Sequence, residues 1–233
     1  MATGVGLRQV GYFDCAGGGQ VVVVDGIAYI GHMRSPHGTS IVDVSDPRNC
    51  RGLASIGMPA GTHSHKVRVG NGLMLVNHEL NGADPRPPPA EFAGGIGIYD
   101  VADPAKPRRL THWTTVGKGV HRFDFDGRYA YASPTLDGYV GTIMLILDLA
   151  EPQAPQEAGR WWLPGQWTAG GEVPSWQGDA YRVLTPEQTL ALASDLGSHS
   201  VFYLNPLLAG IDPAFSWRML RLYERAVHPY LKR

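Results

Sequence analysis

One pattern occurs three times within residues 15–165 of this chain: an apolar strand, a tight turn, a second strand, and then a strand with an aspartate at its centre. The turns contain Asp25-Gly26, Asn71-Gly72 and, with one position of drift, Asp126-Gly127. Asp-Gly and Asn-Gly pairs tolerate the positive φ angles that a two-residue hairpin turn requires. Each copy of the pattern therefore predicts a β-hairpin.

A further strand follows each hairpin and ends at an acid-Pro pair. The central aspartates of these strands are Asp43, Asp100 and Asp148, so the copies are offset by 57 and 48 residues. These steps are close to the roughly 40–50 residues of common propeller blades. A fourth strand is indicated after each proline, and four short antiparallel strands make one blade of a β-propeller.

The predicted fold class is mainly β: a partial β-propeller of three four-stranded blades, at about residues 15–60, 62–115 and 117–165, with the start of a fourth near Gln166. A β-sandwich is the alternative, because its strands also alternate and also break at glycine and proline. The regular four-strand units and their repeated acid-Pro ending favour the propeller. The open sheet edges of a partial ring predict self-association.

The pattern changes after the propeller-like residues 1–180, and a helical α-β-α tail is expected over residues 181–233. Thr185 to Gln188 has the layout of a capping box, with a hydroxyl at the N-cap and a glutamine three residues later. Residues 200–204 predict one buried strand, and a second helix is expected to start at Asp212-Pro213. Such a unit normally belongs to a parallel sheet or barrel. The tail therefore looks like a piece of another protein.

The charge balance and the hydropathy exclude some partners. The 20 basic residues are matched by 21 acidic ones, so no nucleic acid partner is expected. No apolar run approaches membrane-spanning length, and the N-terminus has no leader pattern. We therefore expect a cytoplasmic protein without membrane contact, whose protein or small-molecule partner the composition does not identify.

The repeated motifs resemble those of the bacterial LVIVD-repeat β-propeller proteins. Residues 40–47, 97–104 and 146–150 carry this resemblance, and residues 61–67 and 119–131 add support. The resemblance covers about residues 1–180 and implies a propeller fold. It is nearly silent on activity, and we expect a binding or scaffolding module.

The tail resembles the C-terminal end of luciferase-like, flavin-dependent monooxygenases. Residues 185–188, 206–213 and 217–223 carry this second resemblance. It implies an alternative function, in which the tail is the remnant of such a monooxygenase. Flavin binding is not expected, because the site of a barrel is assembled from loops after many strands.

Histidines recur at matching positions of the repeats. His65 and His121 both lie two residues before an aligned strand, and His63 lies on the same side of a regular strand as His65. Equivalent positions in successive blades face the same region of the ring. The candidate metal ligands are therefore His63, His65, His78 and His121, with Glu79 nearby in sequence. Copper or zinc is the expected metal, because imidazole suits both.

Two other interpretations of the histidines stay open. In the first, which the sequence favours, they tie the blades together by hydrogen bonding to backbone groups. In the second, a distant architectural likeness to the selenium-binding (methanethiol oxidase) propellers implies a metal-dependent oxidase. No catalytic residue is predicted. The repeated aspartates are expected to accept backbone N–H bonds, and the tryptophans at positions 161, 162, 167 and 176 to pack in the core or between blades.

Overall fold

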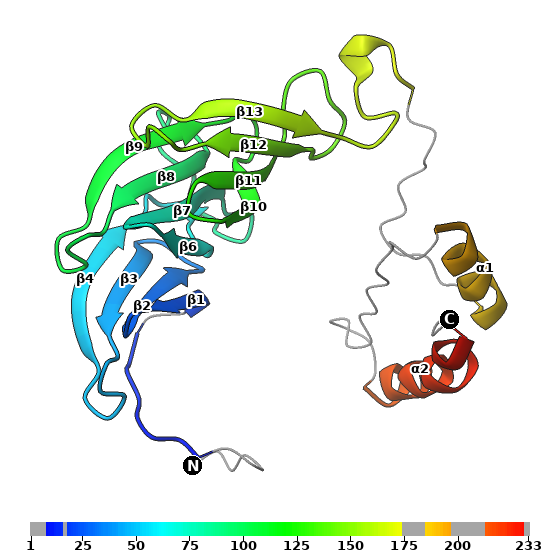
Figure 1. Ribbon diagram of the computed structural model, residues 1–233, viewed down its shortest axis with the longest axis horizontal. Helices are drawn as coiled ribbons and strands as arrows, with labels where there is room; N and C mark the ends of the chain where they lie inside the picture. Colours follow the sequence, from blue (N-terminus) through cyan, green and yellow to red (C-terminus); the bar gives the residue numbers. More distant parts are fainter. Residues whose placement is uncertain (1–7, 16–17, 174–184, 197–212, 231–233) are drawn as a thin grey trace. The chain divides into compact units, whose positions relative to one another are not determined.

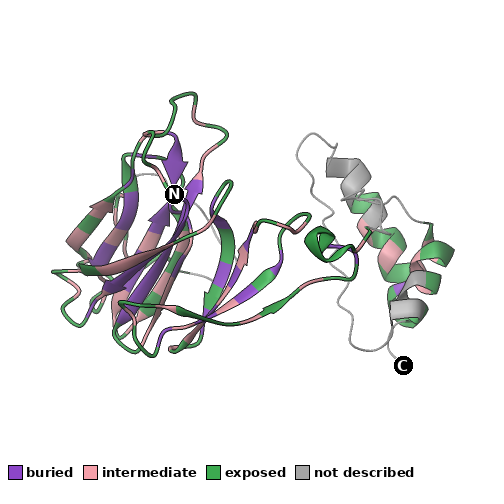
Figure 2. Cartoon of the chain, turned by 90° about the horizontal axis from the view of Figure 1, so that it is seen from above, coloured by how far each residue is buried: buried purple, intermediate pink, exposed green. Residues whose placement is uncertain are grey.

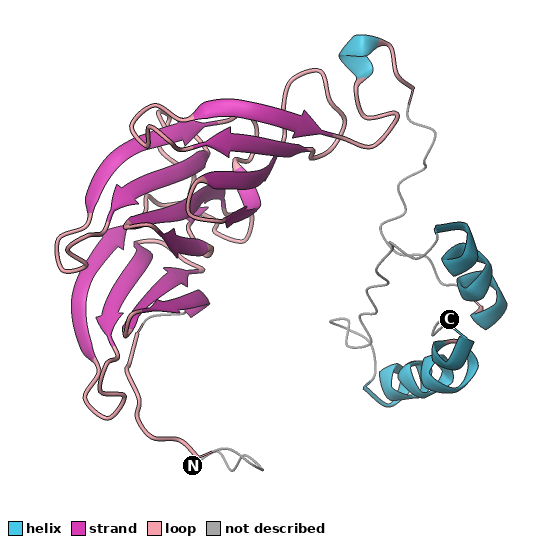
Figure 3. Cartoon of the chain, viewed as in Figure 1, coloured by secondary structure: helices cyan, strands magenta, loops and turns pink. Residues whose placement is uncertain are grey.

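The computed structural model describes residues 8–15, 18–173, 185–196 and 213–230. The chain divides into two compact units, Met1–Trp176 and Gln177–Arg233, and each is described by itself. Strands dominate the first unit and α-helices the second (Figure 3).

The first unit contains three antiparallel sheets, whose strands pair almost entirely in chain order. The strands of the first sheet are β1 (Gly18–Val24), β2 (Ile27–His32), β3 (His37–Asp43) and β4 (Arg51–Gly57). Those of the middle sheet are β5 (Thr62–His63), β6 (Val67–Gly70), β7 (Leu73–Leu80), β8 (Gly95–Asp100) and β9 (Arg108–Thr114). Those of the third sheet are β10 (Val120–Phe125), β11 (Tyr129–Pro134), β12 (Met144–Asp148) and β13 (Gln156–Trp161).

The middle sheet differs from the other two at its edge, where β5 and β6 both pair with β7. β6 pairs with the first half of β7 and β5 with its last two residues, so residues 64–66 interrupt the ladder. In Figure 1, β1, β6 and β10 lie on the inner side of the unit, and β4, β9 and β13 lie on its outer side. The interrupted edge therefore belongs to the inner side.

The coarse fold prediction is confirmed: the described chain is mainly β, with three antiparallel sheets and, within the described residues, no closed barrel. Each sheet falls within one predicted repeat, 15–60, 62–115 or 117–165. After β13 the chain forms a short 3₁₀ helix, η1 (Thr168–Gly170). Any continuation of the expected fourth repeat beyond residue 173 lies outside the described residues.

Two of the three predicted turns, Asp25-Gly26 and Asn71-Gly72, are confirmed as two-residue turns by their backbone angles. The φ values are 49° at Asp25 and 76° at Gly26, and 47° at Asn71 and 72° at Gly72. Positive φ at both central residues is the property of a type I′ turn, whose twist matches that of the flanking strands. In the third copy only the glycine, Gly127, has a positive φ, of 103°.

The repeated aspartates have the structural role that the sequence predicted. Each one accepts a hydrogen bond from the backbone N–H two residues further on, which fixes the turn after the strand. The donors are Ser45 to Asp43 (3.0 Å), Ala102 to Asp100 (3.0 Å) and Ala150 to Asp148 (2.8 Å). Each aspartate also forms an ion pair with an arginine: Asp43 with Arg51, Asp100 with Arg108, and Asp148 with Arg128.

Two apolar layers bury both faces of the middle sheet, and Figure 2 shows that the buried residues of this unit lie mainly in strands. Alternate residues of β7 belong to different layers, because successive side chains of a strand point to opposite faces. Leu73 and Leu75 pack toward the third sheet, whereas Met74 and Val76 pack toward the first. The same alternation decides which way the polar end of β7 points.

The second unit contains α1 (Pro186–Leu196), α2 (Pro213–Ala226) and the 3₁₀ helix η2 (His228–Tyr230). The predicted capping box is confirmed, since Gln188 N–H donates to Thr185 Oγ1 (3.3 Å) and Thr185 N–H donates to Gln188 Oε1 (2.9 Å). The strand expected at residues 200–204 lies outside the described residues, so the α-β-α arrangement stays a prediction. Among the described helices, none combines the length and apolar character needed to cross a bilayer.

Edge strands of the first and third sheets carry exposed apolar side chains. Val21 and Val23 are exposed on β1, and Trp161 is exposed on β13. Such edges can pair with another chain. The self-association expected from the sequence stays a prediction, which size-exclusion chromatography tests.

Candidate metal centre

The interrupted edge of the middle sheet brings two histidines and a glutamate to one face. His63 is the register partner of Glu79, so the two side chains leave the sheet on the same side. Ser64 points the other way, and its hydroxyl lies 3.4 Å from Thr39 Oγ1 of the first sheet. His65 returns to the side of His63, and their ring centroids lie 4.4 Å apart. The prediction that these two histidines point the same way is confirmed.

His121 of β10 joins this group from the third sheet. Its Nδ1–H donates to both carboxylate oxygens of Glu79, at 3.0 and 2.8 Å, and His63 Nε2–H donates to Oε2 at 2.8 Å. The ring centroids of His65 and His121 are 5.0 Å apart. One carboxylate thus gathers imidazoles from two sheets. We call His63, His65, Glu79 and His121 the Glu79 cluster.

The Glu79 cluster lies at the edge of the interior. His63, His65 and Glu79 are buried, whereas the side chain of His121 is 51% exposed. Burial disfavours the ionised carboxylate, but hydrogen bonds from His63 and His121 outweigh it and hold the pKa of Glu79 below its usual value. Burial, reinforced by the proximity of His63, lowers the pKa of His65 to about 4. The ring of His65 is therefore neutral at pH 7, the form that binds metals.

The donor set fits a transition metal ion. One ligating atom from each of His63, His65 and Glu79 can be chosen so that all three lie within 4.8 Å of one another. Zinc bonds to imidazole nitrogen and carboxylate oxygen are about 2.0–2.2 Å long, so three atoms this close can share one ion. His63 Nδ1 is buried and has no hydrogen-bond partner among the described residues. Buried polar atoms normally have a partner, and a metal ion would supply one here.

Asn77 supports the cluster through hydrogen bonds to its backbone surroundings, and the sequence analysis did not identify this residue. Its Oδ1 accepts the backbone N–H of Lys66 at 2.7 Å, and its Nδ2 donates to the carbonyl of Val120 at 3.0 Å. This fully buried amide therefore links the segment after His65 to the strand that carries His121. In the sequence, an asparagine within an otherwise apolar strand indicates this role, because a buried amide normally hydrogen-bonds to backbone groups.

His78, the fourth predicted ligand, lies apart from the other three. It precedes Glu79 in β7 and points to the opposite face, where its ring centroid is 4.4 Å from that of His112. The Nε2 atoms of both rings are buried without a partner among the described residues. Burial, reinforced by His112, lowers the pKa of His78 to about 3. We call these two residues the His78 pair; His112 was not among the predicted ligands.

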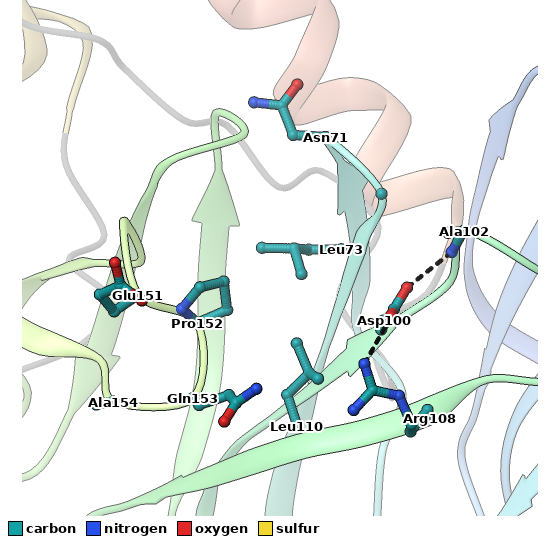
Figure 4. A pocket seen from close by; sticks show the side chains of 11 residues that line it. Asn71, Leu73, Asp100, Ala102, Arg108, Leu110, Glu151, Pro152, Gln153 and Ala154 are labelled. Carbon is teal, nitrogen blue, oxygen red and sulfur yellow. Dashed lines mark hydrogen bonds and ion pairs between the residues drawn. The ribbon is translucent and has the colours of Figure 1, made fainter.

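A pocket of about 610 Å³ lies away from both histidine groups, between the middle sheet and the turn at residues 151–154 (Figure 4). Of its two carboxylates, Asp100 and Glu151, the first accepts hydrogen bonds from the backbone N–H of Ala102 and from Arg108, the latter at 2.9 Å. None of the described residues that line it is a histidine. Asp100 and Arg108 are paired with each other at the turn after β8, so the Glu79 cluster is the stronger candidate site.

Comparisons with known proteins do not assign a function to this site. No protein-family model matches the chain, and no curated protein matches it. The chemistry of the site therefore follows from its donor atoms, their burial and their charges.

Proposed function

We propose that this chain is a repeat protein of the binding or scaffolding kind, in which the Glu79 cluster holds one zinc or copper ion. The observation that carries the proposal is the convergence of His63, His65 and Glu79, together with the buried nitrogen of His63 that has no partner among the described residues. Imidazole and carboxylate donors suit both Zn²⁺ and Cu²⁺. His121 is the fourth ligand in this proposal, and its exposed side chain gives the ion access from solvent.

The proposal includes the finer architecture, a partial propeller of the LVIVD-repeat kind. Its support is the repetition itself: three sheets of consecutive antiparallel strands, each closed by an aspartate that bonds the backbone two residues on. The cluster also uses inner strands, since His65 precedes β6 and His121 lies on β10. Inner strands are where a propeller lines its central channel.

Metal analysis of protein purified without a histidine tag tests the proposal. We expect about one equivalent of bound zinc or copper after loading and dialysis, with copper bound more tightly than zinc, as ligand preferences dictate. His65→Gln removes one imidazole and is expected to weaken binding at least about tenfold. His112→Gln is the matched control, because it removes a partly buried histidine from the opposite face of the middle sheet.

Two results would contradict the proposal. A metal content far below one equivalent in the wild-type protein would exclude the site. Equal metal affinity in the two variants would show that the ion binds elsewhere on the chain.

A further inference from the structure

A second pocket, of about 530 Å³, adjoins the Glu79 cluster along the chain. Residues of the inner strands β1, β6 and β10 and of the third sheet line it. Two of these residues directly follow cluster histidines: Lys66 follows His65, and Arg122 follows His121, with Cα atoms about 3.8 Å apart. Pockets that bind small molecules have volumes of roughly 300–1,000 Å³. This pocket has the size of a ligand site, and two of its lining residues are chain neighbours of the cluster.

The pocket carries an excess of positive charge. Its lining includes three cations, Lys66, Arg68 and Arg122, and one carboxylate, Asp124. Arg68 is already engaged, because its Nε donates to Asp124 Oδ1 at 2.6 Å and its Nη1 donates to Gln20 Oε1 at 2.5 Å. Lys66 and Arg122 form no ion pair within the described part of the chain. Two of the three cations in this pocket therefore have no ion-pair partner among the described residues.

The remainder of the lining combines polar groups with an apolar surface. The larger apolar side chains are Phe123, Ile143, Met144, Trp161 and Leu163. Trp161 is 57% exposed, although a tryptophan of a folded domain usually buries most of its surface. A flat aromatic surface beside two unpaired cations is complementary to a molecule with an apolar body and an anionic group.

We propose that this pocket binds a small organic anion, in which Lys66 and Arg122 hold a carboxylate, phosphate or sulfonate group and Trp161 packs against an aromatic body. The pocket's own charges and surface are sufficient for this binding, so it does not require a metal ion. The anion site is therefore proposed independently of the Glu79 cluster.

A pair of probes with the same ring system tests the role of charge. 2-Naphthoate is titrated by calorimetry into the full-length protein in the presence of EDTA, and 2-naphthalenemethanol serves as its neutral counterpart. We expect saturable binding of 2-naphthoate at one site. The alcohol is expected to bind about tenfold more weakly or worse, because it lacks the charge-assisted hydrogen bonds to two cations.

Single variants locate the binding. Arg122→Gln and Lys66→Gln are each expected to weaken 2-naphthoate binding about tenfold, and Trp161→Leu to weaken both probes. Arg48→Gln is the charge-matched control, because Arg48 is exposed, lies outside the pocket and forms no ion pair within the described residues. It is expected to bind like the wild type. Circular dichroism of each variant checks that it is folded.

Several results would overturn the inference: no saturable 2-naphthoate binding in the millimolar range, equal binding of the neutral alcohol, or equal losses in Arg122→Gln and Arg48→Gln. A separate zinc titration of the same preparations distinguishes the two proposals. Zinc binding without 2-naphthoate binding would reject only the anion site. The reverse result would reject only the metal centre.

Discussion

Two groups of histidines occupy opposite faces of β7 in very different surroundings. Toward the third sheet, the Glu79 cluster gathers three imidazoles around one carboxylate, and the side chain of His121 reaches solvent. Toward the first sheet, the His78 pair packs two rings at an interplanar angle of 47°, and their Nε2 atoms are buried without a partner among the described residues. Adjacent residues of one strand, His78 and Glu79, therefore belong to a packed pair on one face and to a polar, accessible group on the other.

The carboxylate, more than the number of imidazoles, therefore distinguishes the candidate metal site from the other histidine group. Glu79 remains ionised because His63 and His121 donate to it, so a negative charge lies ready for a cation. On the other face, burial lowers the pKa values of His78 and His112, which keeps both rings neutral at pH 7. Two neutral rings pack much as aromatic side chains do.

Glu79→Gln is expected to have the largest effect, because it removes the feature that sets the cluster apart. Glutamine keeps the shape of the side chain but not its charge, so zinc affinity is expected to fall about 100-fold or more. The metal-free protein is expected to lose about 2 kcal/mol of unfolding free energy, because His63 and His121 lose a charged acceptor. Competition titration with a chromophoric chelator measures the first quantity, and urea denaturation measures the second.

The outcome that contradicts this prediction is wild-type zinc affinity in Glu79→Gln. The carboxylate would then play no part in metal binding, and the two faces of β7 would differ only in burial.

Two glycines support the two groups and give the next largest effect. A Cβ at Gly31 would lie 2.7 Å from the backbone of Ser64 and His65, whereas a Cβ at Gly97 would lie 2.8 Å from His78 Nε2. Replacing either glycine by alanine is expected to cost about 1–3 kcal/mol of unfolding free energy, because the packed neighbours must move.

Zinc affinity separates these two alanine variants. Gly31→Ala shifts the backbone that carries His63 and His65, so a weakening of about tenfold is expected, since ligands must be held in place. Gly97→Ala disturbs the other face and is expected to bind zinc as the wild type does. A greater loss in Gly97→Ala would show that the two groups are coupled through β7.

His121→Gln tests the solvent-exposed side of the Glu79 cluster. His121 is the most exposed member of the Glu79 cluster, so water can replace its nitrogen at the ion. Its loss is expected to weaken zinc binding about tenfold, which is less than the loss of Glu79. A loss as large as that of Glu79→Gln in the same competition titration would make His121 a full and essential ligand.

The sequence predicted the parts of this comparison that depend on local patterns. Asp25-Gly26 and Asn71-Gly72 predict their turns, because the required positive φ angles restrict the choice of residue. The register of the repeats also places His65 and His121 together, because equivalent positions of neighbouring sheets meet on the inner side. These features follow from short stretches of chain or from their repetition.

The sequence did not predict which face His78 would take. A shift of one residue along a strand moves a side chain to the other face, and repeat alignment does not resolve that parity at a strand end. The strand β7 runs on to Leu80, and this extension directs Glu79 to one side and His78 to the other. His112 comes from β9, and no local pattern connects it with His78. Such a contact depends on the assembled sheet.

The pH dependence of stability tests the two faces with the smallest expected effect. In the unfolded chain the pKa of a histidine is about 6.5, whereas burial lowers the pKa of His78 to about 3 and also lowers that of His112 in the folded chain. Below about pH 6.5 the unfolded chain therefore takes up protons that the folded chain does not, and the free energy of unfolding falls as the pH falls.

His112→Gln removes one such group. Between about pH 6.5 and 5 the metal-free variant is expected to lose less stability than the wild type, as measured by urea denaturation in EDTA. The pKa of His65 is lowered in both proteins, so its contribution cancels in the difference. Equal slopes would show that His112 takes up its proton in the folded state, and the neutral packing assigned to the His78 pair would then be wrong.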